Sequence, residues 1–314
     1  MKREPKTLQE AILFFSNPDN CREYLVARRW PEGVVCPRCG GKNVVFSAKH
    51  NRWQCASHHA RRQFTLKTGT IFEGSPIGLD KWLAAMWLIV NCKNGVSSYE
   101  VHRAIGVTQK SAWFMLQRLR LALQGDNGGK LSGSVEVDET FIGGKSRFMH
   151  KHDRERKIHG TGGHDKVIVM GILERGGKVR TTVMPSRKKK ALQAQVKRHV
   201  EVGSALYSDA LKSYTGLTKD YAHEVIDHAE KYVDGQIHTN GLESFWSLLK
   251  RGLHGTYISV EPFHLFRYLD EQCFRFNNRT LTDSQRFSIV ASQVIGKRLT
   301  YAEVTGKTDS CQPA

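Results

Sequence analysis

Three acidic residues occur in segments whose patterns suit a metal site: Asp138 in GSVEVDETFIGG, Asp209 at the end of SALYSD, and Glu243 in GLESFWSLLKRG. Residues 133–144 alternate apolar and polar side chains like a β-strand, which puts Asp138 on one face together with Glu136. A carboxylate on such a strand is costly unless it is paired or binds a cation, and hard divalent cations prefer carboxylate oxygens. We therefore expect Asp138 to be paired or to bind a hard divalent cation, with Glu136 as the alternative ligand on that face.

A base, Lys250, follows Glu243 by seven residues in a segment that is otherwise mostly apolar or small. At about 100° per residue, seven helical residues fall about 20° short of two turns, and the two side chains point the same way, roughly 10 Å apart. This spacing is too wide for a salt bridge and suits two groups that contact one extended partner. Asn240-x-x-Glu243 also fits a capping box, so Glu243 taken alone could simply cap the helix. Phe245 and Trp246, between the acid and the base, are interpreted as core residues.

A second set of residues has the spacing of a zinc site. Cys36 and Cys39 form a C-x2-C turn, and Cys55 is followed three residues later by His58. Zinc binds four nitrogen or sulfur ligands in a tetrahedron, and a site closed by four protein ligands is structural. We expect Zn²⁺ on Cys36, Cys39, Cys55 and His58, with His59 as the alternative fourth ligand.

The charge of the chain favours a nucleic-acid partner. Lys and Arg outnumber Asp and Glu by 48 to 30, a formal net charge of +18. Such an excess is typical of proteins that bind an extended polyanion with strong salt dependence; a basic protein without such a partner is the alternative. The run Arg187-Lys188-Lys189-Lys190 is basic throughout, and we expect Arg187, Lys188 and Lys189 to contact DNA.

Cysteine usage and hydropathy indicate the compartment. The chain has seven cysteines, an odd number, and its N-terminus, MKREPKTLQE, lacks the apolar core of a secretory signal. The longest uninterrupted apolar run, Trp82–Val90, has nine residues and is too short to span a membrane. We expect a cytoplasmic protein with reduced cysteines and no membrane association.

Composition shifts along the chain indicate its organisation. We expect a zinc-ribbon DNA-binding domain at 1–75, a helical segment at 76–125, a Gly-rich linker at 126–134, a catalytic domain at 135–280 and a polar tail at 281–314.

Residues 97–122 contain two helical patterns separated by a turn with a glycine, the outline of a helix-turn-helix. Ser97 or Ser98 can cap the first helix and Thr108 the second. An ordinary helical hairpin is the alternative. As a DNA reader, the second helix would present Gln109, Lys110, Trp113 and either Gln117 or Arg118.

The catalytic domain is expected to have the order β-β-β-α-β-β followed by two helices. The strands are expected at 133–144, 166–177, 178–185, 204–209 and 223–228, and the helices at 188–203, 238–252 and 262–278. This order matches the ribonuclease-H-like α/β fold, in which the first and fourth strands are neighbours. Asp138 and Asp209 would then meet, and Glu243 would lean over them from the following helix. Three such acids can hold two divalent cations that activate a nucleophile and stabilise the leaving oxygen of a phosphodiester.

DET at 138–140, YSDA at 207–210, HTNGLESFWSLLKRG at 238–252 and FRFNNR at 274–279 resemble the DDE transposases of bacterial insertion sequences. RWPEGVVCPRCG and TGTIFEGS resemble the N-terminal zinc ribbon of the insertion-sequence-1595 family, and the likeness extends from about residue 14 to 280. The resemblance implies that Asp138, Asp209 and Glu243 are the catalytic triad and that Lys250 supports DNA. His58 departs from the family, which more often has a cysteine there.

A transposase is therefore the expected function. It would bind the terminal inverted repeats of its element, free 3′-hydroxyl ends and join them to target DNA, with two Mg²⁺ in each catalytic site. We expect it to assemble as a homo-oligomer on DNA, in association with the nucleoid. A zinc-ribbon transcriptional regulator without catalysis and a structure-specific nuclease of the same fold are the alternatives.

Overall fold

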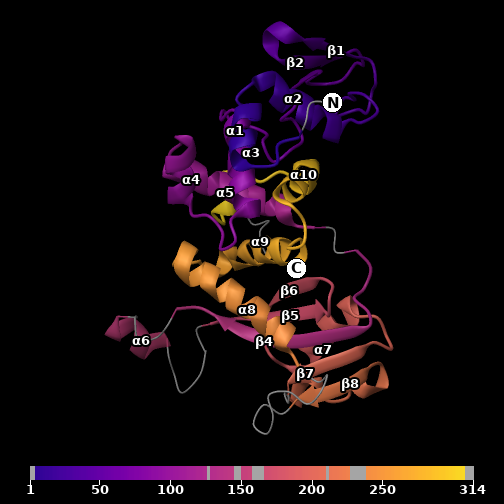
Figure 1. Ribbon diagram of the computed structural model, residues 1–314, viewed down its shortest axis with the longest axis vertical. Helices are drawn as coiled ribbons and strands as arrows, with labels where there is room; N and C mark the ends of the chain where they lie inside the picture. The colour runs from indigo at the N-terminus through magenta and orange to yellow at the C-terminus, as the bar shows by residue number, and fades with distance from the viewer. Residues whose placement is uncertain are drawn as a thin grey trace. The chain divides into compact units, whose positions relative to one another are not determined.

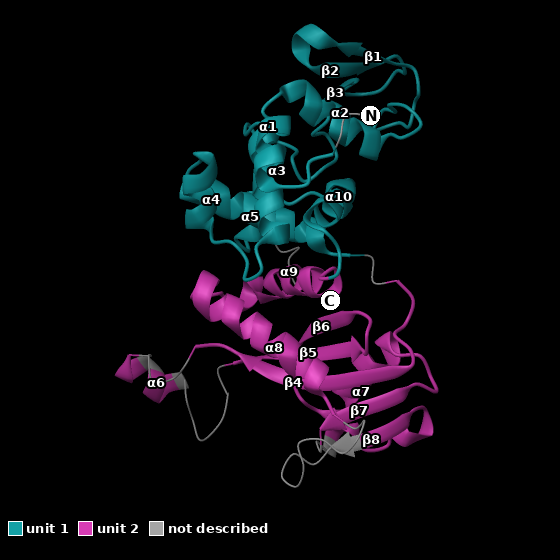
Figure 2. Cartoon of the chain, in the orientation of Figure 1, with its two compact units in different colours: residues 1–125, 280–314 teal, residues 126–279 magenta. Residues whose placement is uncertain are grey.

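The computed structural model describes residues 4–125, 128–144, 150–157, 166–209, 212–226 and 238–307. The chain divides into two compact units, both of mixed secondary structure (Figures 1 and 2). Unit 1 consists of residues 1–125 and 280–314, and unit 2 consists of residues 126–279.

The N-terminal part of unit 1 is a small antiparallel sheet preceded by two helices. The helices are α1 (Leu8–Phe15) and α2 (Pro18–Arg29), and the strands are β1 (Val44–Ser47), β2 (Arg52–Cys55) and β3 (Gln63–Phe64), in that order. The rings of Trp53 and Phe64 stack across β2 and β3 with centroids 5.8 Å apart, and Trp30 packs against both rings. Because such short strands bury little surface, this aromatic cluster supplies much of the local core.

The remainder of unit 1 is helical. It contains α3 (Leu79–Asn91), α4 (Ser98–Ile105), α5 (Gln109–Leu123), α10 (Asp283–Gln293) and α11 (Tyr301–Val304). The apolar helix α3 is buried along most of its length. Phe287 of α10 is surrounded by the rings of Phe15, Tyr24 and Trp87, at centroid distances of 5.6, 5.7 and 5.0 Å. Helices from both ends of the chain therefore share one core.

The C-terminal segment is part of this core. Composition predicts a polar tail at 281–314, whereas the structure places 280–314 in unit 1. Ile71 N donates to Val294 O at 3.1 Å, and Gly296 N donates to Gly69 O at 2.9 Å. The segment packs because α10 carries a buried stripe on an otherwise polar sequence, made of Phe287, Val290 and Ala291.

The helix pair α4 and α5 forms where the sequence predicts it. Ser97 caps α4 in a capping box with Glu100, and Thr108 caps α5. Gly106 ends α4 at φ 62°, a left-handed conformation that glycine adopts at little cost. The predicted caps are confirmed.

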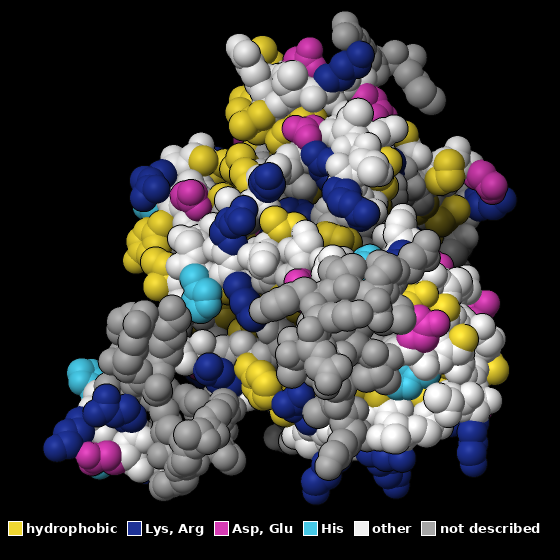
Figure 3. Space-filling model, turned by 60° about the horizontal axis from the view of Figure 1, so that its bottom comes forward, with side chains coloured by type: hydrophobic (Ala, Val, Ile, Leu, Met, Phe, Trp, Pro, Cys, Tyr) yellow, Lys and Arg dark blue, Asp and Glu magenta, His cyan; other side chains and the backbone are white. Residues whose placement is uncertain are grey.

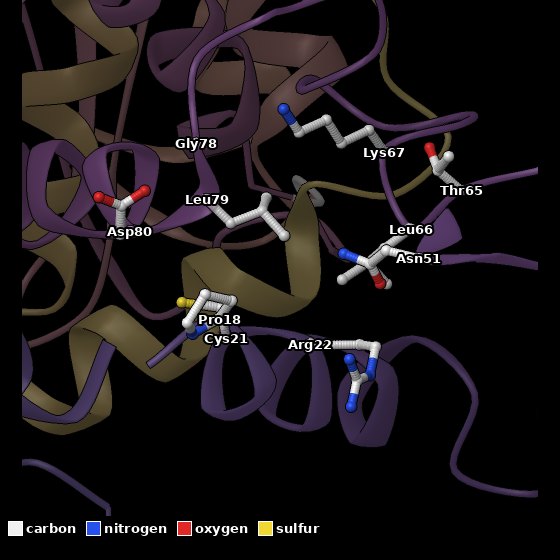
Figure 4. A pocket seen from close by; sticks show the side chains of 10 residues that line it. All are labelled: Pro18, Cys21, Arg22, Asn51, Thr65, Leu66, Lys67, Gly78, Leu79 and Asp80. Carbon is white, nitrogen blue, oxygen red and sulfur yellow. The ribbon is translucent and has the colours of Figure 1, made fainter. Parts of the chain in front are cut away.

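Unit 1 also contains a pocket of about 370 Å³ beside the ribbon sheet (Figure 4). Its lining combines apolar and charged side chains from α2, from the segments around the sheet and from the start of α3. Lys67 in this lining donates to Ser75 O at 2.9 Å and Ile77 O at 2.6 Å, and burial lowers the pKa of its amine. These hydrogen bonds tie the ribbon to the chain that leads into α3.

Unit 2 is built on a five-stranded sheet with the order β6-β5-β4-β7-β8. The strands are β4 (Ser134–Ile142), β5 (Val167–Glu174), β6 (Val179–Met184), β7 (Ala205–Asp209) and β8 (Ala222–Ile226). The β4–β5 and β5–β6 pairs are antiparallel, and the β4–β7 and β7–β8 pairs are parallel. The first and fourth strands of this unit are therefore neighbours, as predicted, and β5 and β6 form the expected hairpin.

Helices cover both faces of this sheet (Figure 1). They are α7 (Lys189–His199) on one face and α8 (Asn240–Gly252) and α9 (Leu265–Asn277) on the other, with α6 (Lys151–Lys157) between β4 and β5 in the chain. On β4, Val135 and Val137 pack in the α7 core, so the intervening residues face α8. The strand alternation thus determines which acids face which helix.

None of the helices in the described ranges is long and apolar enough to cross a membrane.

Candidate active site and metal centre

Asp138 lies on β4 and its carboxylate is fixed at both oxygens. Oδ2 accepts from the indole Nε1 of Trp246 at 2.9 Å, and Oδ1 accepts from the backbone N of Glu139 at 2.8 Å. Burial raises the pKa of Asp138, and the Trp246 hydrogen bond opposes that rise. The charges of Asp209 and Glu243 raise the pKa further. The pKa of Asp138 thus reflects the charges of the two other acids predicted from sequence, Asp209 and Glu243.

Asp209 is the last residue of β7, beside β4. Val137 is in register with Ser208 across the parallel β4–β7 pair, and Asp138 and Asp209 are the next residues on their strands. Neighbouring strands lie about 4.8 Å apart, and parallel partners point to the same face. Because Val137 faces α7, Asp138 and Asp209 both face α8. Strand register therefore accounts for their proximity.

Glu243 stands in the first turn of α8, and its side chain is exposed. The N-cap of this helix is Thr239, and no capping-box hydrogen bond forms there. The capping role that the sequence leaves open for Glu243 is thus not found in the structure. Lys250 lies on the same continuous helix and is also exposed.

The acids form an open arrangement. Within the described ranges, one group of Cys, His, Asp or Glu side chains has all its ligand atoms within 4.8 Å of one another. That group lies in the zinc ribbon and does not include Asp138. Asp138 and Asp209 are half-buried and Glu243 is exposed. The arrangement is thus open to solvent at Glu243 and is not a closed cage for one ion.

Glu136, the alternative metal ligand, has another task. Its side chain is 1% exposed, and Oε1 accepts from Arg175 Nε at 2.9 Å. Its Oε2 accepts from Leu242 N at 3.0 Å, and His238 Nδ1 lies 3.6 Å from Oε1. Glu136 thereby satisfies a backbone N–H at the beginning of α8, where a negative charge is favourable. It holds the helix that carries Glu243.

Glu139 is a buried acid whose role the sequence does not reveal. It shares the α7 side of β4 with Val135 and Val137, as the alternation predicts, and it accepts a hydrogen bond from Tyr214 Oη. Burial, followed by the charges of Asp209 and Asp138, raises the pKa of Glu139 to about 8, while Arg187 opposes the rise. Its position next to Asp138 in DET was the only available signal.

Arg187, which is expected to contact DNA, is half-buried and also faces Glu139. Its guanidinium lies 3.6 Å from Glu139 Oε2 and 5.3 Å from the centroid of the Phe141 ring. Lys188 and Lys189, by contrast, are exposed where α7 begins. Lysines are unfavourable at the positive end of a helix dipole, so their presence there is consistent with an anionic partner. Figure 3 shows one face of the molecule on which Lys and Arg side chains are widespread.

Arg118 is buried, which contradicts its predicted role as a DNA contact. It is 6% exposed and donates to Leu299 O, Ile71 O and Glu73 O, each at 2.9 Å. The guanidinium points inward because it satisfies carbonyls that distant segments bring to α5. Gln117 is likewise buried, and Lys110 is exposed as predicted.

Three of the four predicted zinc ligands lie together, and His59 takes the place of His58 as the fourth. Cys36, Cys39, Cys55 and His59 have ligand atoms within 4.8 Å of one another. Cys36 Sγ lies 3.5 Å from His59 Nε2, and Cys39 Sγ lies 3.6 Å from Cys55 Sγ. His58, the expected fourth ligand, is exposed and outside this group.

Local geometry selects His59. Its Nδ1 is 2.8 Å from Ala60 O, and Nε2, which faces Cys36 Sγ, is the ring nitrogen placed to bind a metal. Arg61 adopts φ 57°, and this left-handed residue reverses the chain after the histidines. Three thiols and one imidazole form a donor set that suits tetrahedral Zn²⁺.

Comparisons with known proteins agree with this division of the chain. Residues 130–277 match the model of the ISXO2-like transposase domain, and residues 16–61 match that of the transposase zinc-ribbon domain. The chain is 29% identical over 258 residues to a Halobacterium salinarum protein described as an uncharacterized protein in transposable element ISH50. That alignment covers 77% of this chain and 85% of the relative. No solved structure matches the chain.

Proposed function

Because the chain belongs to the transposases of the insertion-sequence-1595 family, whose zinc-ribbon and ISXO2-like domains together match more than half of it, we propose that it catalyses transposition by DNA cleavage and joining. It binds the terminal inverted repeats of an insertion sequence, frees 3′-hydroxyl ends and transfers them to target DNA. The relative in transposable element ISH50 supports this assignment.

Asp138, Asp209 and Glu243 are the proposed catalytic acids, and the strand order of unit 2 supports a ribonuclease-H-like catalytic domain. The observations that carry the proposal are the strand register that sets Asp138 beside Asp209 and the hydrogen bond from Trp246 of α8, the helix that also carries Glu243. Together they would hold two Mg²⁺, which supply Lewis-acid stabilisation of the attacking and leaving oxygens of a phosphodiester. Their oxygen donors and open arrangement fit such hard cations.

The surrounding residues have separate proposed tasks. Glu136 and Arg175 fix the start of α8, so that Glu243 stands over the sheet. Lys250, two turns along the same helix and equally exposed, contacts a phosphate of the DNA strand being cut. Lys188 and Lys189 provide further backbone contacts from the start of α7. No covalent enzyme intermediate is involved.

Unit 1 is proposed to recognise the element ends. Zn²⁺ bound by Cys36, Cys39, Cys55 and His59 would stabilise the ribbon, in which short strands bury little surface. Lys110, exposed near the start of α5, is the remaining candidate for DNA contact from the helix pair. We further propose that the protein acts in the cytoplasm at the nucleoid and assembles as a homo-oligomer on DNA.

Purified protein incubated with labelled element ends and a target plasmid tests the proposal. Wild type should cut and join the ends with Mg²⁺, but not without a divalent ion. Asp138→Ala should abolish both steps while end binding by gel shift persists. Cleavage that persists in Asp138→Ala would refute the assignment. Cleavage by wild type without joined products would instead indicate a nuclease.

A further inference from the structure

We infer that Trp246 is a positioning residue for Asp138, holding its carboxylate in one orientation for metal binding through the indole N–H. This inference rests on the proposed function and adds a residue to that site. Trp246 itself would contact neither metal nor DNA.

The carboxylate of Asp138 is restrained from two sides. Trp246 Nε1 donates to Oδ2 at 2.9 Å, and Glu139 N donates to Oδ1 at 2.8 Å. Rotation of an aspartate about χ2 is otherwise broad, so two donors from different elements define its plane. A carboxylate has about four acceptor positions, so each oxygen keeps one for a cation. The restraint therefore orients Asp138 without using up its capacity to bind metal.

Trp246 is in turn held rigidly. Its side chain is 4% exposed and its ring packs against Phe245, with centroids 5.1 Å apart. The ring lies over Gly171, the residue that pairs with Asp138 across β4 and β5. A Cβ at Gly171 would lie 2.6 and 2.8 Å from two carbons of the Trp246 ring. The bare backbone of Gly171 thus lets the indole approach the sheet beside the acid.

The choice of side chain supports a positioning role. Phenylalanine could fill the same apolar space, but tryptophan adds one N–H donor, and here that donor is directed to a carboxylate of the proposed site. Partners that orient metal ligands typically account for about 10–100-fold in metal affinity or activity. Loss of the N–H alone should therefore weaken metal binding and leave the core filled.

The variant Trp246→Phe tests this inference in the full-length protein. Mn²⁺ binding is measured by electron paramagnetic resonance, and strand cleavage is measured over a range of Mg²⁺ concentrations. We expect about 10–100-fold weaker Mn²⁺ binding and a matching rise in the Mg²⁺ concentration needed for cleavage. The matched control is Trp82→Phe, because Trp82 is 1% exposed and donates its indole N–H to Ser75 Oγ at 3.1 Å in unit 1. The control should keep the wild-type metal dependence.

Wild-type metal binding and cleavage in Trp246→Phe would overturn the inference. If Trp246→Phe fails to fold, benzothienylalanine at position 246 decides, because it keeps the shape of the indole and replaces the N–H with sulfur. If the protein with benzothienylalanine binds Mn²⁺ with wild-type affinity, the inference about Trp246 is refuted. An inactive Asp138→Ala alongside an unaffected Trp246→Phe would leave the proposed function intact, whereas an active Asp138→Ala would refute the function itself.

Discussion

Replacing Gly171 by alanine should destabilise unit 2 by overpacking the contact between its sheet and α8. The added methyl carbon would lie 2.6 and 2.8 Å from ring carbons of Trp246 and 2.9 Å from Leu242 Cδ2. Non-bonded carbons normally lie about 3.5–4.0 Å apart, so the ring must retreat by about 1 Å. Trp246 and Leu242 are 4% and 0% exposed, which leaves them little room to move.

The expected cost is about 2–3 kcal/mol, towards the upper end of the range of about 1–3 kcal/mol for overpacked cores. For a unit of this size, each kcal/mol lowers the melting temperature by about 2–4 °C, so the transition of unit 2 should fall by about 4–12 °C. Cleavage should also decrease because the indole N–H moves away from Asp138, while end binding by unit 1 should persist.

Calorimetry or circular dichroism measures the shift, and Gly129→Ala is the matched control. Gly129 lies in unit 2, has no positive φ, and a Cβ there would meet nothing within 4 Å. The control should stay within about 0.5 kcal/mol of wild type, as surface substitutions usually do. A Gly171→Ala protein as stable as the control would show that α8 does not press on β5 as described.

Three further predictions concern other parts of the chain. His59→Ala should lower the zinc content measured by elemental analysis and His58→Ala should not; the reverse result would restore His58 as the ligand. Arg118→Ala should cost unit 1 about 3 kcal/mol in urea unfolding, because it removes the donor to two buried carbonyls and one half-buried carbonyl. A change in DNA binding at unaltered stability would contradict this. Burial raises the pKa of Glu139 to about 8, so its neutral form stabilises the fold at low pH, and this contribution is lost as pH rises through about 8. Glu139→Gln should therefore lose less stability than wild type between about pH 5 and 8, and parallel stability curves would contradict the assignment.

The fold of unit 2 follows largely from local patterns. Alternation over 133–144 predicts β4 and its two faces, and the order of the elements predicts that β4 and β7 are neighbours. The caps at Ser97 and Thr108 are equally local, because each depends on a few consecutive residues. The strand faces and the caps are predictable because short-range geometry determines them, whereas the β4–β7 pairing was expected because the element order matches the ribonuclease-H-like fold.

Features that depend on distant partners could not be predicted in the same way. Arg118 is buried because carbonyls of Ile71, Glu73 and Leu299 reach it from other segments, which no helical periodicity reveals. His58 and His59 are adjacent and chemically alike, and the reversal of the chain at Arg61 was not visible in their spacing. The inclusion of α10 in unit 1 likewise depends on long-range packing.

Asp138 illustrates both cases. Its position on a β-branched strand identifies it as an acid that needs a partner, and the sequence suffices for that inference. Its donor Trp246 lies on a helix more than a hundred residues later, and aromatic patterning indicates only that this side chain is buried. The hydrogen bond emerges only when β4, β5 and α8 are packed together.

Iron-mediated cleavage of the polypeptide tests most directly whether the three acids share one metal site. Fe²⁺ bound in place of Mg²⁺ reacts with added hydrogen peroxide, giving Fe³⁺, hydroxide and a hydroxyl radical that breaks the nearby chain. Added ascorbate returns the iron to Fe²⁺, and mass spectrometry locates the breaks. We predict breaks beside Asp138, Asp209 and Glu243 in the same sample, suppressed by excess Mg²⁺ and absent from Asp209→Ala. Breaks beside only one of the three acids, or breaks that persist in Asp209→Ala, would contradict the convergence on which the proposed function depends.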